Sequence, residues 1–320
     1  MHLRGIDFGY VMNASGARNF FGDGYWFHPK LLPFGLDYTG STFVAKTTPL
    51  LEKKGNMPLD LITLQPKELL PRCIKINLIR GDVLNAVGLS SPGAENLLKR
   101  GLWQQRRVPF FISFAAVKET VTERLQEWRR FVFLLGQHLR GFHAPVGLEM
   151  NFTCPTTGVE KPFIEEILAA LDIAATLGIS LVVKLNVLMS PEIAMRIERH
   201  PACDAICQSN TIPGGELPDQ INWKKIFGQK ESPLKKYGGG GLSGPVLFPF
   251  VVNWIHRART LGFKKPIIGC GGIMSVRCAD MMFSAGASAI QLGSVSIVRP
   301  WRVKKIIACA NQYRATKHGA

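Results

Sequence analysis

A cysteine stands at the end of an apolar segment in LEMNFTCPTTG, residues 148–158, where it lies between Thr153 and Pro155. A free cysteine is often a small core residue. At the end of a barrel strand, however, a thiol is placed where catalytic groups usually stand, and it acts as an acid–base group once its pKa falls toward neutrality. Cys154 is therefore a candidate catalytic base, with simple burial in the core as the alternative.

Two lysines, Lys46 and Lys184, each interrupt an otherwise apolar run. Burying an unpaired ammonium group is costly, so each lysine is expected to face an anionic or electron-rich ligand. A structural ion pair is the alternative, and Glu149 is the obvious carboxylate partner for either lysine.

Glycine turns occur in three late segments: GGLSG at 240–244, GCGGI at 269–273 and QLGS at 291–294. Backbone N–H groups left open at such turns bind phosphate, and barrels commonly bind phosphate after their last two strands. The three turns together predict a phosphate-binding site.

The elements that would position these groups alternate along the chain. Eight short runs rich in Val, Ile, Leu and Phe lack polar alternation, which is typical of strands buried on both faces. With helical patterns between most of them, they predict a single α/β domain over residues 1–320, a (β/α)8 TIM barrel with inserted segments near 51–84 and 213–239; a doubly wound sheet is the alternative. The expected strands are 10–14, 42–46, 109–114, 147–151, 180–185, 205–209, 266–269 and 289–292, and the expected helices are 119–137, 163–177, 191–199, 246–261, 276–285 and 300–314.

The composition excludes several classes of protein. Hydrophobic residues make up 46% and charged residues 19%, as in a globular protein and not a disordered one. The net charge of +16 favours anionic ligands, but the basic residues are scattered in pairs, so a solvated basic surface is expected and a nucleic-acid site is not.

Targeting and redox signals agree with a cytoplasmic protein. No apolar stretch reaches the roughly 18 residues of a membrane helix, and MHLRGIDFGYVMNASG lacks the apolar centre of a signal peptide. The seven cysteines include no C-x-x-C pair and no zinc-site spacing. We therefore expect a reduced, cytoplasmic protein with no metal and no membrane contact.

The motifs in their order resemble the flavin-dependent dihydroorotate dehydrogenases, most closely the soluble class 1 enzymes. The similarity runs from about residue 8 to residue 297. The matching segments are NASG at 13–16, KTTPLLEKKGNMP at 46–58, NAVGL at 85–89, NFTCP at 151–155, VVKLN at 182–186, SNT at 209–211, GGLSGP at 240–245, GCGGI at 269–273 and QLGS at 291–294.

This resemblance implies an FMN cofactor that lies across the barrel mouth. Ala14, Ser15 and Gly16 would line one side of it, Lys46 and Thr47 would lie near the reactive edge of the ring, and Lys184 would face its pyrimidine edge. The other residues implied for the cofactor are Asn85, Asn151, Ser243, Gly244, Gly271, Gly272, Gly293 and Ser294.

The resemblance also implies an oxidoreductase that converts dihydroorotate to orotate in pyrimidine biosynthesis. Cys154 would remove a proton while hydride passes to flavin N5, with Lys46 as the second catalytic residue. Asparagine side chains suit this substrate because each offers a donor and an acceptor to a ring of alternating N–H and C=O groups. The substrate residues implied are Lys46, Asn85, Gly88, Leu89, Asn151, Asn210 and Thr211.

Two departures from the family pattern bear on the substrate. Thr156 stands where the family usually has an asparagine, and Phe248 stands where it usually has a lysine. A threonine cannot offer both an N–H₂ donor and a carbonyl acceptor. A different dihydropyrimidine therefore remains an alternative substrate.

The electron acceptor and assembly follow from resemblance alone. KTTPLLEKKGNMP is more similar to the class 1 branch that forms homodimers and reduces fumarate than to the branch that passes electrons through an iron–sulfur partner to NAD. Fumarate and a homodimer are therefore expected. Class 2 enzymes, which are membrane-associated, use serine as the base and carry an N-terminal helical extension.

Two further hypotheses stay open. The tRNA dihydrouridine synthases share FMN, the barrel and a cysteine after the fourth strand, and the positive charge suits them. A catalytically silent flavin-binding paralogue is the other, since Thr156 and Phe248 alter the substrate side. Residues 156–162 are expected to form a mobile lid.

Overall fold

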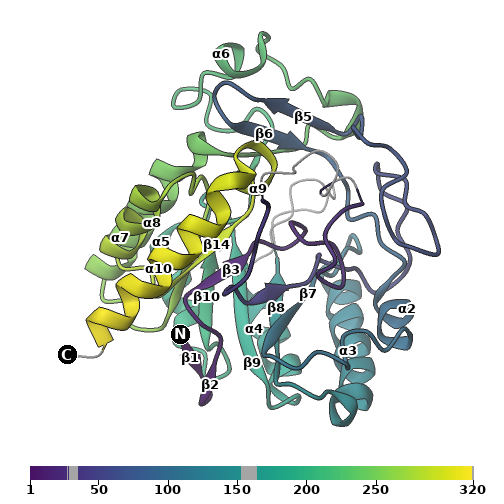
Figure 1. The fold of residues 1–320 in the computed structure, drawn as a ribbon. Coiled ribbons are helices and arrows are strands. Elements are labelled where there is room, and N and C mark those ends of the chain that lie inside the picture. Colours follow the sequence, from purple (N-terminus) through teal and green to yellow (C-terminus); the bar gives the residue numbers. More distant parts are fainter. Residues whose placement is uncertain (27, 29–34, 153–163, 319–320) are drawn as a thin grey trace.

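A computed structural model describes residues 1–26, 28, 35–152 and 164–318, with side chains described up to residue 312 (Figure 1). Cys154, Thr156 and the expected lid at 156–162 lie outside the described residues.

A parallel eight-stranded sheet forms the centre of the fold. Its strand order is β3-β14-β13-β10-β9-β8-β7-β4. The two ends of this order meet, because Thr42 N donates to Val11 O over 2.8 Å and Met12 bridges Thr42 in parallel. The sheet therefore closes into the expected barrel, and the doubly wound alternative is wrong. The strands are β3 (Val11–Asn13), β4 (Phe43–Val44), β7 (Phe110–Phe114), β8 (Val146–Asn151), β9 (Ser180–Leu185), β10 (Ala205–Gln208), β13 (Ile267–Cys270) and β14 (Ala289–Leu292).

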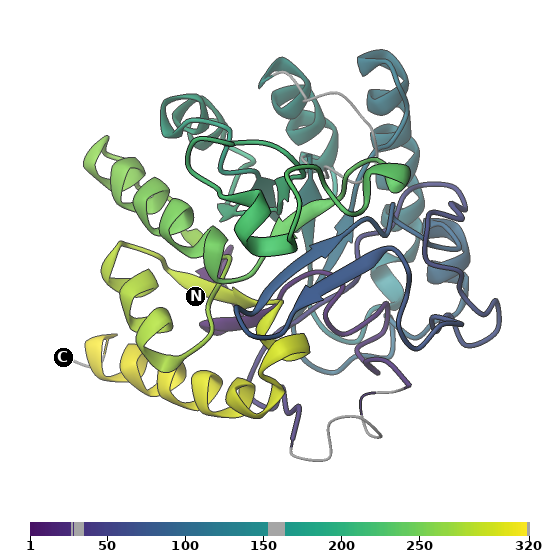
Figure 2. The ribbon, with the colours of Figure 1, turned by 90° about the horizontal axis from the view of Figure 1, so that it is seen from above.

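Helices surround this barrel (Figure 2). Of these helices, α4, α7, α8 and α10 pack against the barrel strands β9, β13, β14 and β3, and local signals set several of the helix ends. Thr120 and Glu123 form a reciprocal capping box at the start of α3, and Ser190 caps α5 with Pro191 in its first turn. The helices are α2 (Ala94–Lys99), α3 (Val121–His138), α4 (Ile164–Ala175), α5 (Pro191–Glu198), α6 (Trp223–Phe227), α7 (Phe248–Thr260), α8 (Val276–Ser284), α9 (Val295–Val298) and α10 (Val303–His318), with 3-10 turns η1 (Leu139–Gly141), η3 (Lys235–Tyr237), η4 (Pro245–Leu247) and η5 (Pro300–Arg302).

The inside of the barrel is apolar near the amino ends of the strands. A short hairpin of β1 (His2–Leu3) and β2 (Ile6–Asp7) lies at this end, and the Phe8 and Phe111 ring centroids are 4.2 Å apart. Nearer the carboxyl ends the inward side chains become polar. The barrel is therefore a filled core at one end and an open, polar mouth at the other.

A second sheet lies over that mouth. Its antiparallel order is β11-β12-β6-β5, made from β5 (Ile74–Asn77), β6 (Asp82–Asn85), β11 (Ile212–Pro213) and β12 (Gly241–Ser243). Figures 1 and 2 show β5 and β6 crossing above the barrel strands. The expected insertion at 51–84 supplies β5 and nearly all of β6, while that at 213–239 supplies α6 and η3.

Among the described helices, none combines the length and apolar character needed to cross a bilayer.

Candidate active site

A cavity of about 970 Å³ lies between the barrel mouth and the second sheet. Most of the residues expected from the sequence to contact cofactor or substrate line this one cavity. They are Ala14, Ser15, Gly16, Lys46, Thr47, Asn85, Leu89, Asn151, Lys184, Asn210, Thr211, Ser243, Gly271, Gly272, Gly293 and Ser294.

Two of the expected residues that the structure describes are not among the cavity lining. Gly88 packs beside Asn56, and Gly244 lies behind Gly272 with its carbonyl turned toward it. Direct ligand contact by Gly88 and Gly244 therefore stays a prediction, made from residues that lie beside the cavity wall and not in it. Cys154 lies outside the described residues.

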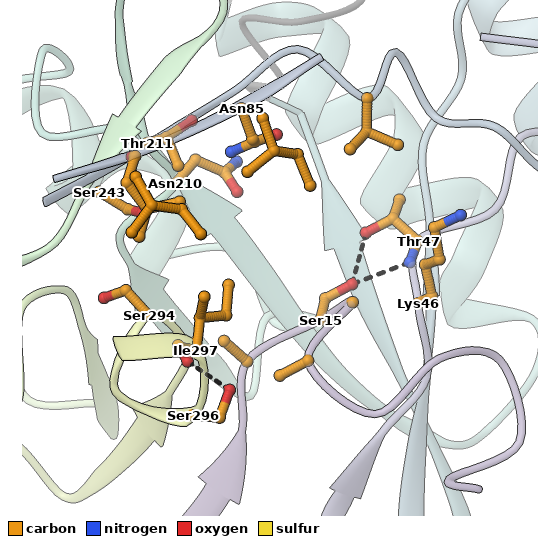
Figure 3. Close-up of a pocket in the computed structure, with 18 of the residues that line it drawn as sticks. Ser15, Lys46, Thr47, Asn85, Asn210, Thr211, Ser243, Ser294, Ser296 and Ile297 are labelled. Atoms are coloured by element: carbon orange, nitrogen blue, oxygen red, sulfur yellow. Dashed lines mark hydrogen bonds between the residues drawn. The ribbon is translucent and has the colours of Figure 1, made fainter. Parts of the chain in front are cut away.

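Hydroxyl and amide groups form a continuous chain of hydrogen bonds from one side of the cavity to the other. Ser15 Oγ and Thr47 Oγ1 are 2.7 Å apart, and Ser15 also accepts from the Thr47 N–H (Figure 3). Asn151 donates to Thr47 Oγ1 over 3.2 Å and accepts from Asn210 Nδ2 over 2.7 Å. These contacts join β3, β4, β8 and the segment after β10, so they hold the polar groups in fixed orientations.

Asparagine and threonine side chains come together on the opposite side. Figure 3 shows Asn85, Asn210, Thr211 and Ser243 across the cavity from Ser15 and Thr47. Asn186 Nδ2 donates to Thr211 O, which anchors the segment that carries Asn210. Three asparagines at this mouth can recognise a planar ring that presents both N–H and C=O groups.

Lys46 lies at the cavity wall without a carboxylate partner in the described part of the chain. Its Nζ donates to Ser90 O over 2.5 Å and lies 4.5 Å above the Phe20 ring. Burial lowers the pKa of Lys46 to about 7. This lysine is therefore poised to exchange its proton near neutral pH.

Lys184 forms the ion pair with Glu149 that the sequence had allowed for either lysine. Its Nζ lies 3.4 Å from Glu149 Oε1 and 3.0 Å from Gln291 Oε1, and both partners are buried. Burial by itself would lower the pKa of Lys184, but Glu149, and to a lesser degree Cys207 and Cys270, raise it above its ordinary value. The structural ion pair thus belongs to Lys184 and not to Lys46.

Glycines form a wall of bare backbone on the late-strand side. A Cβ atom on Gly271 would lie 2.8 Å from Leu247 Cγ, and one on Gly293 would lie 3.2 Å from Ala14 Cβ. Gly272 has φ of +65°, which side-chain residues rarely adopt. A wall without side chains lets a flat or phosphorylated ligand approach the backbone N–H groups closely, so the cavity fits a nucleotide-like cofactor.

Several residues of the site were missed in the sequence. Gln291 and Asn186 stand inside the QLGS and VVKLN motifs, and that position was the available signal. An apolar rim at the cavity entrance had no such signal; its members are Leu69, Leu70, Ile76, Leu78 and Ile297. Within the described residues, no cluster of three or more His, Cys, Asp or Glu side chains is arranged to hold a metal ion.

The fold is shared with a solved structure. The chain is similar to the crystal structure of DHODH in complex with ferulenol from Eimeria tenella, with a TM-score of 0.66, 17% identity, and coverage of 98% of this chain and 84% of that one. At this identity the likeness supports the barrel fold alone.

Curated relatives have a higher sequence identity to the chain than this solved structure has. The chain is 31% identical over 235 residues to the dihydroorotate dehydrogenase B (NAD(+)), catalytic subunit, of Anoxybacillus flavithermus, covering 71% of this chain and 69% of that protein. It is 27% identical to the protein of the same description from Geobacter metallireducens, covering 89% of both chains. Because these descriptions give NAD(+), the expected likeness to the fumarate branch is not supported.

The family model for dihydroorotate dehydrogenase matches residues 35–312, most of the chain. That match spans the lysines, the asparagines and the glycine wall that meet in the cavity. The chain therefore belongs to the dihydroorotate dehydrogenase family, and it is an oxidoreductase of the kind that acts on a CH–CH donor.

Proposed function

We propose that this protein oxidises dihydroorotate to orotate with FMN as its bound cofactor. The observation that carries the proposal is the arrangement of one cavity: a glycine wall on one side, and lysine, asparagine and hydroxyl groups on the other. Membership of the family supports the same reaction.

The residues around the cavity fit FMN. Gly272, Gly293, Ser294 and Ser243 would hold the phosphate and ribityl groups, since backbone N–H groups and hydroxyls there are not covered by side chains. Ala14 to Gly16 and Thr47 would line the ring on the other side, and Lys184 would face the pyrimidine edge. When bound, FMN supplies the two-electron acceptor for the reaction.

The substrate would lie against the asparagines. Asn85, Asn151 and Asn210 would pair with its ring amides, and Lys46 would bind its carboxylate. Cys154, three residues after Asn151, is proposed to remove the proton from the substrate carbon. A thiol suits this role when nearby cationic groups favour its thiolate.

The proposed electron acceptor is NAD(+), reached through a second subunit. The descriptions of the relatives as NAD(+)-linked catalytic subunits support this over fumarate. A homodimer and a cytoplasmic location remain predictions from the sequence.

The decisive experiment is anaerobic mixing of the purified yellow protein with dihydroorotate. Loss of flavin absorbance within seconds is expected, and Cys154→Ala should keep bound FMN while slowing this loss by several orders of magnitude. A colourless protein that takes up no FMN would end the proposal.

A different dihydropyrimidine is the second candidate, because Phe248 starts α7 against Gly272 where the family usually has a lysine. Mixing with dihydrouracil separates the two, since that ring lacks the carboxylate. Binding of tRNA at two salt concentrations tests the dihydrouridine alternative, because phosphate-driven binding weakens steeply with salt.

A further inference from the structure

Two buried lysines line the same cavity in opposite electrostatic settings. Lys46 is 6% exposed and donates to a backbone carbonyl beside an aromatic ring. Lys184 is 4% exposed and lies against a carboxylate. The carboxylate itself, Glu149, is 1% exposed and does not line the cavity, so it acts on a ligand only through its neighbours, of which Lys184 carries the opposite charge.

Every oxygen of Glu149 has a donor. Oε1 accepts from Ser113 Oγ over 2.9 Å and from Lys184 Nζ over 3.4 Å, and Oε2 accepts from Gln291 Nε2 over 2.7 Å. Gln291 completes a ring, because its Oε1 accepts from Lys184 over 3.0 Å. These hydrogen bonds fix the orientation of the buried carboxylate, and they fix the position of the Lys184 ammonium group.

We propose that Glu149 is a positioning residue that keeps Lys184 a permanent cation at the cavity wall, whereas Lys46 lies at the same wall with no carboxylate partner among the described residues. Glu149 and Gln291 aim the Lys184 ammonium group at the cofactor edge, and the carboxylate keeps that group protonated. This role rests on the proposed function only where it refers to FMN; the protonation of the two lysines does not depend on it.

Among the residues that the structure describes, the other titratable groups that face Lys184 are two thiols. Cys207, on β10, donates to Gln291 Oε1 over 3.4 Å, and Cys270, on β13, lines the cavity. Thiols compete poorly with a carboxylate as partners for an ammonium group near neutral pH. Without the Glu149 charge, burial would dominate and Lys184 would lose its proton in the accessible pH range.

The first test uses NMR of the full-length protein with lysine labelled with ¹³C at Cε, assigned with Lys46→Met and Lys184→Met. In the unaltered protein the Lys46 signal should titrate near neutral pH, and the Lys184 signal should stay constant from about pH 6 to about pH 10. In Glu149→Gln, Lys184 should titrate inside that range. A wild-type Lys184 signal that titrates near neutrality would overturn the proposal without any variant at position 149.

The second test measures the reduction potential of bound FMN against pH. If Lys184 in Glu149→Gln is deprotonated when the flavin is oxidised, reduction takes up one more proton for two electrons. The potential should then fall more steeply than in the wild type, by about 30 mV per pH unit, a tenfold change in equilibrium constant. Glu149→Gln with Lys184→Met should return to the wild-type slope, which identifies Lys184 and not a thiol as the proton site.

The matched control is Glu166→Gln. Glu166 is also buried and pairs with Arg124 at 2.7 Å, but between α3 and α4 and away from the cavity. This variant should lower stability and leave both the Lys184 signal and the potential slope unchanged. A folded Glu149→Gln that behaves like Glu166→Gln refutes the role of Glu149, whereas failure to bind FMN with the expected NMR result refutes only the proposed function.

Discussion

The carbonyl oxygen of Gly244 lies 2.5 Å from the position that a Cβ atom on Gly272 would occupy. Two turns far apart in the sequence thus pack backbone against backbone at the cavity wall. Any side chain at position 272 must push one turn away from the other.

Gly272→Ala should therefore weaken FMN binding by at least about tenfold, since one strained turn costs roughly 1–3 kcal/mol. Flavin fluorescence during titration of the flavin-free protein measures this. Gly262→Ala is the control, because Gly262 also has positive φ, +91°, but open space around its Cβ position. Equal effects of both substitutions would show that φ, and not the close approach, matters.

Asn210→Leu should raise the KM for dihydroorotate by about tenfold or more. Its amide bridges to Asn151, so the substitution leaves Asn151 Oδ1 without its donor and removes one proposed substrate contact. Initial rates with a dye acceptor give kcat and KM separately. Asn96→Ala, on the outer surface of α2, should leave both unchanged; an unchanged KM in Asn210→Leu would exclude it from substrate recognition.

Affinity for orotate should depend on pH through Lys46. Only its ammonium form pairs with a carboxylate, so the affinity should be constant below about pH 7 and weaken by up to about tenfold per pH unit above it. Spectral titration of the flavin checks this. Lys46→Arg should keep the affinity constant to about pH 9, because a guanidinium group stays charged; a wild-type affinity that is constant throughout would remove Lys46 from carboxylate binding.

The same lysine should affect stability with a definite sign. Between about pH 7 and the ordinary lysine pKa of about 10.4, the unfolded chain binds more protons than the folded one at this position. Lys46 therefore makes the free energy of unfolding rise with pH across this window. Urea unfolding of Lys46→Met should show a smaller rise over the same window, and a larger rise would contradict the lowered pKa.

Phe8→Ala should lower the free energy of unfolding by about 3–5 kcal/mol, because Phe8 is fully buried against Phe111 at the amino end of the barrel. Flavin content should stay unchanged, since the cavity is at the other end. Phe133→Ala, at a position that is 64% exposed, should change stability by no more than about 0.5 kcal/mol.

The barrel was largely predictable because its strands are continuous apolar runs. The strands at 180–185 and 289–292 were predicted to the residue. The strands β5, β6, β11 and β12 were not predicted, since they are short and IKIN is partly exposed. They also join into one sheet only through the pairing of β6 with β12, for example Leu84 opposite Leu242, over a hundred residues apart. The residue pattern of a single segment does not predict its pairing with a segment far away in the sequence.

The site was predictable where it follows strand ends. Side chains at the carboxyl ends of parallel strands meet at one mouth, so Asn151 and Lys184 could be placed from their motifs alone. The pairing of Glu149 with Lys184 could not be predicted, because it depends on which side chains share the barrel interior. Gly88 and Gly244 do not line the cavity, and the sequence could not show this, since a glycine in a motif serves a tight turn as readily as a binding surface.

The pairing of β3 with β14 brings Ala14 beside Gly293, so the first and last strands of the ring supply facing parts of one wall. No half of the chain can then assemble the wall by itself. Co-expressed fragments divided in the middle of the sequence would have to find each other before any yellow colour appeared, and colour would become a direct report that the ring had closed.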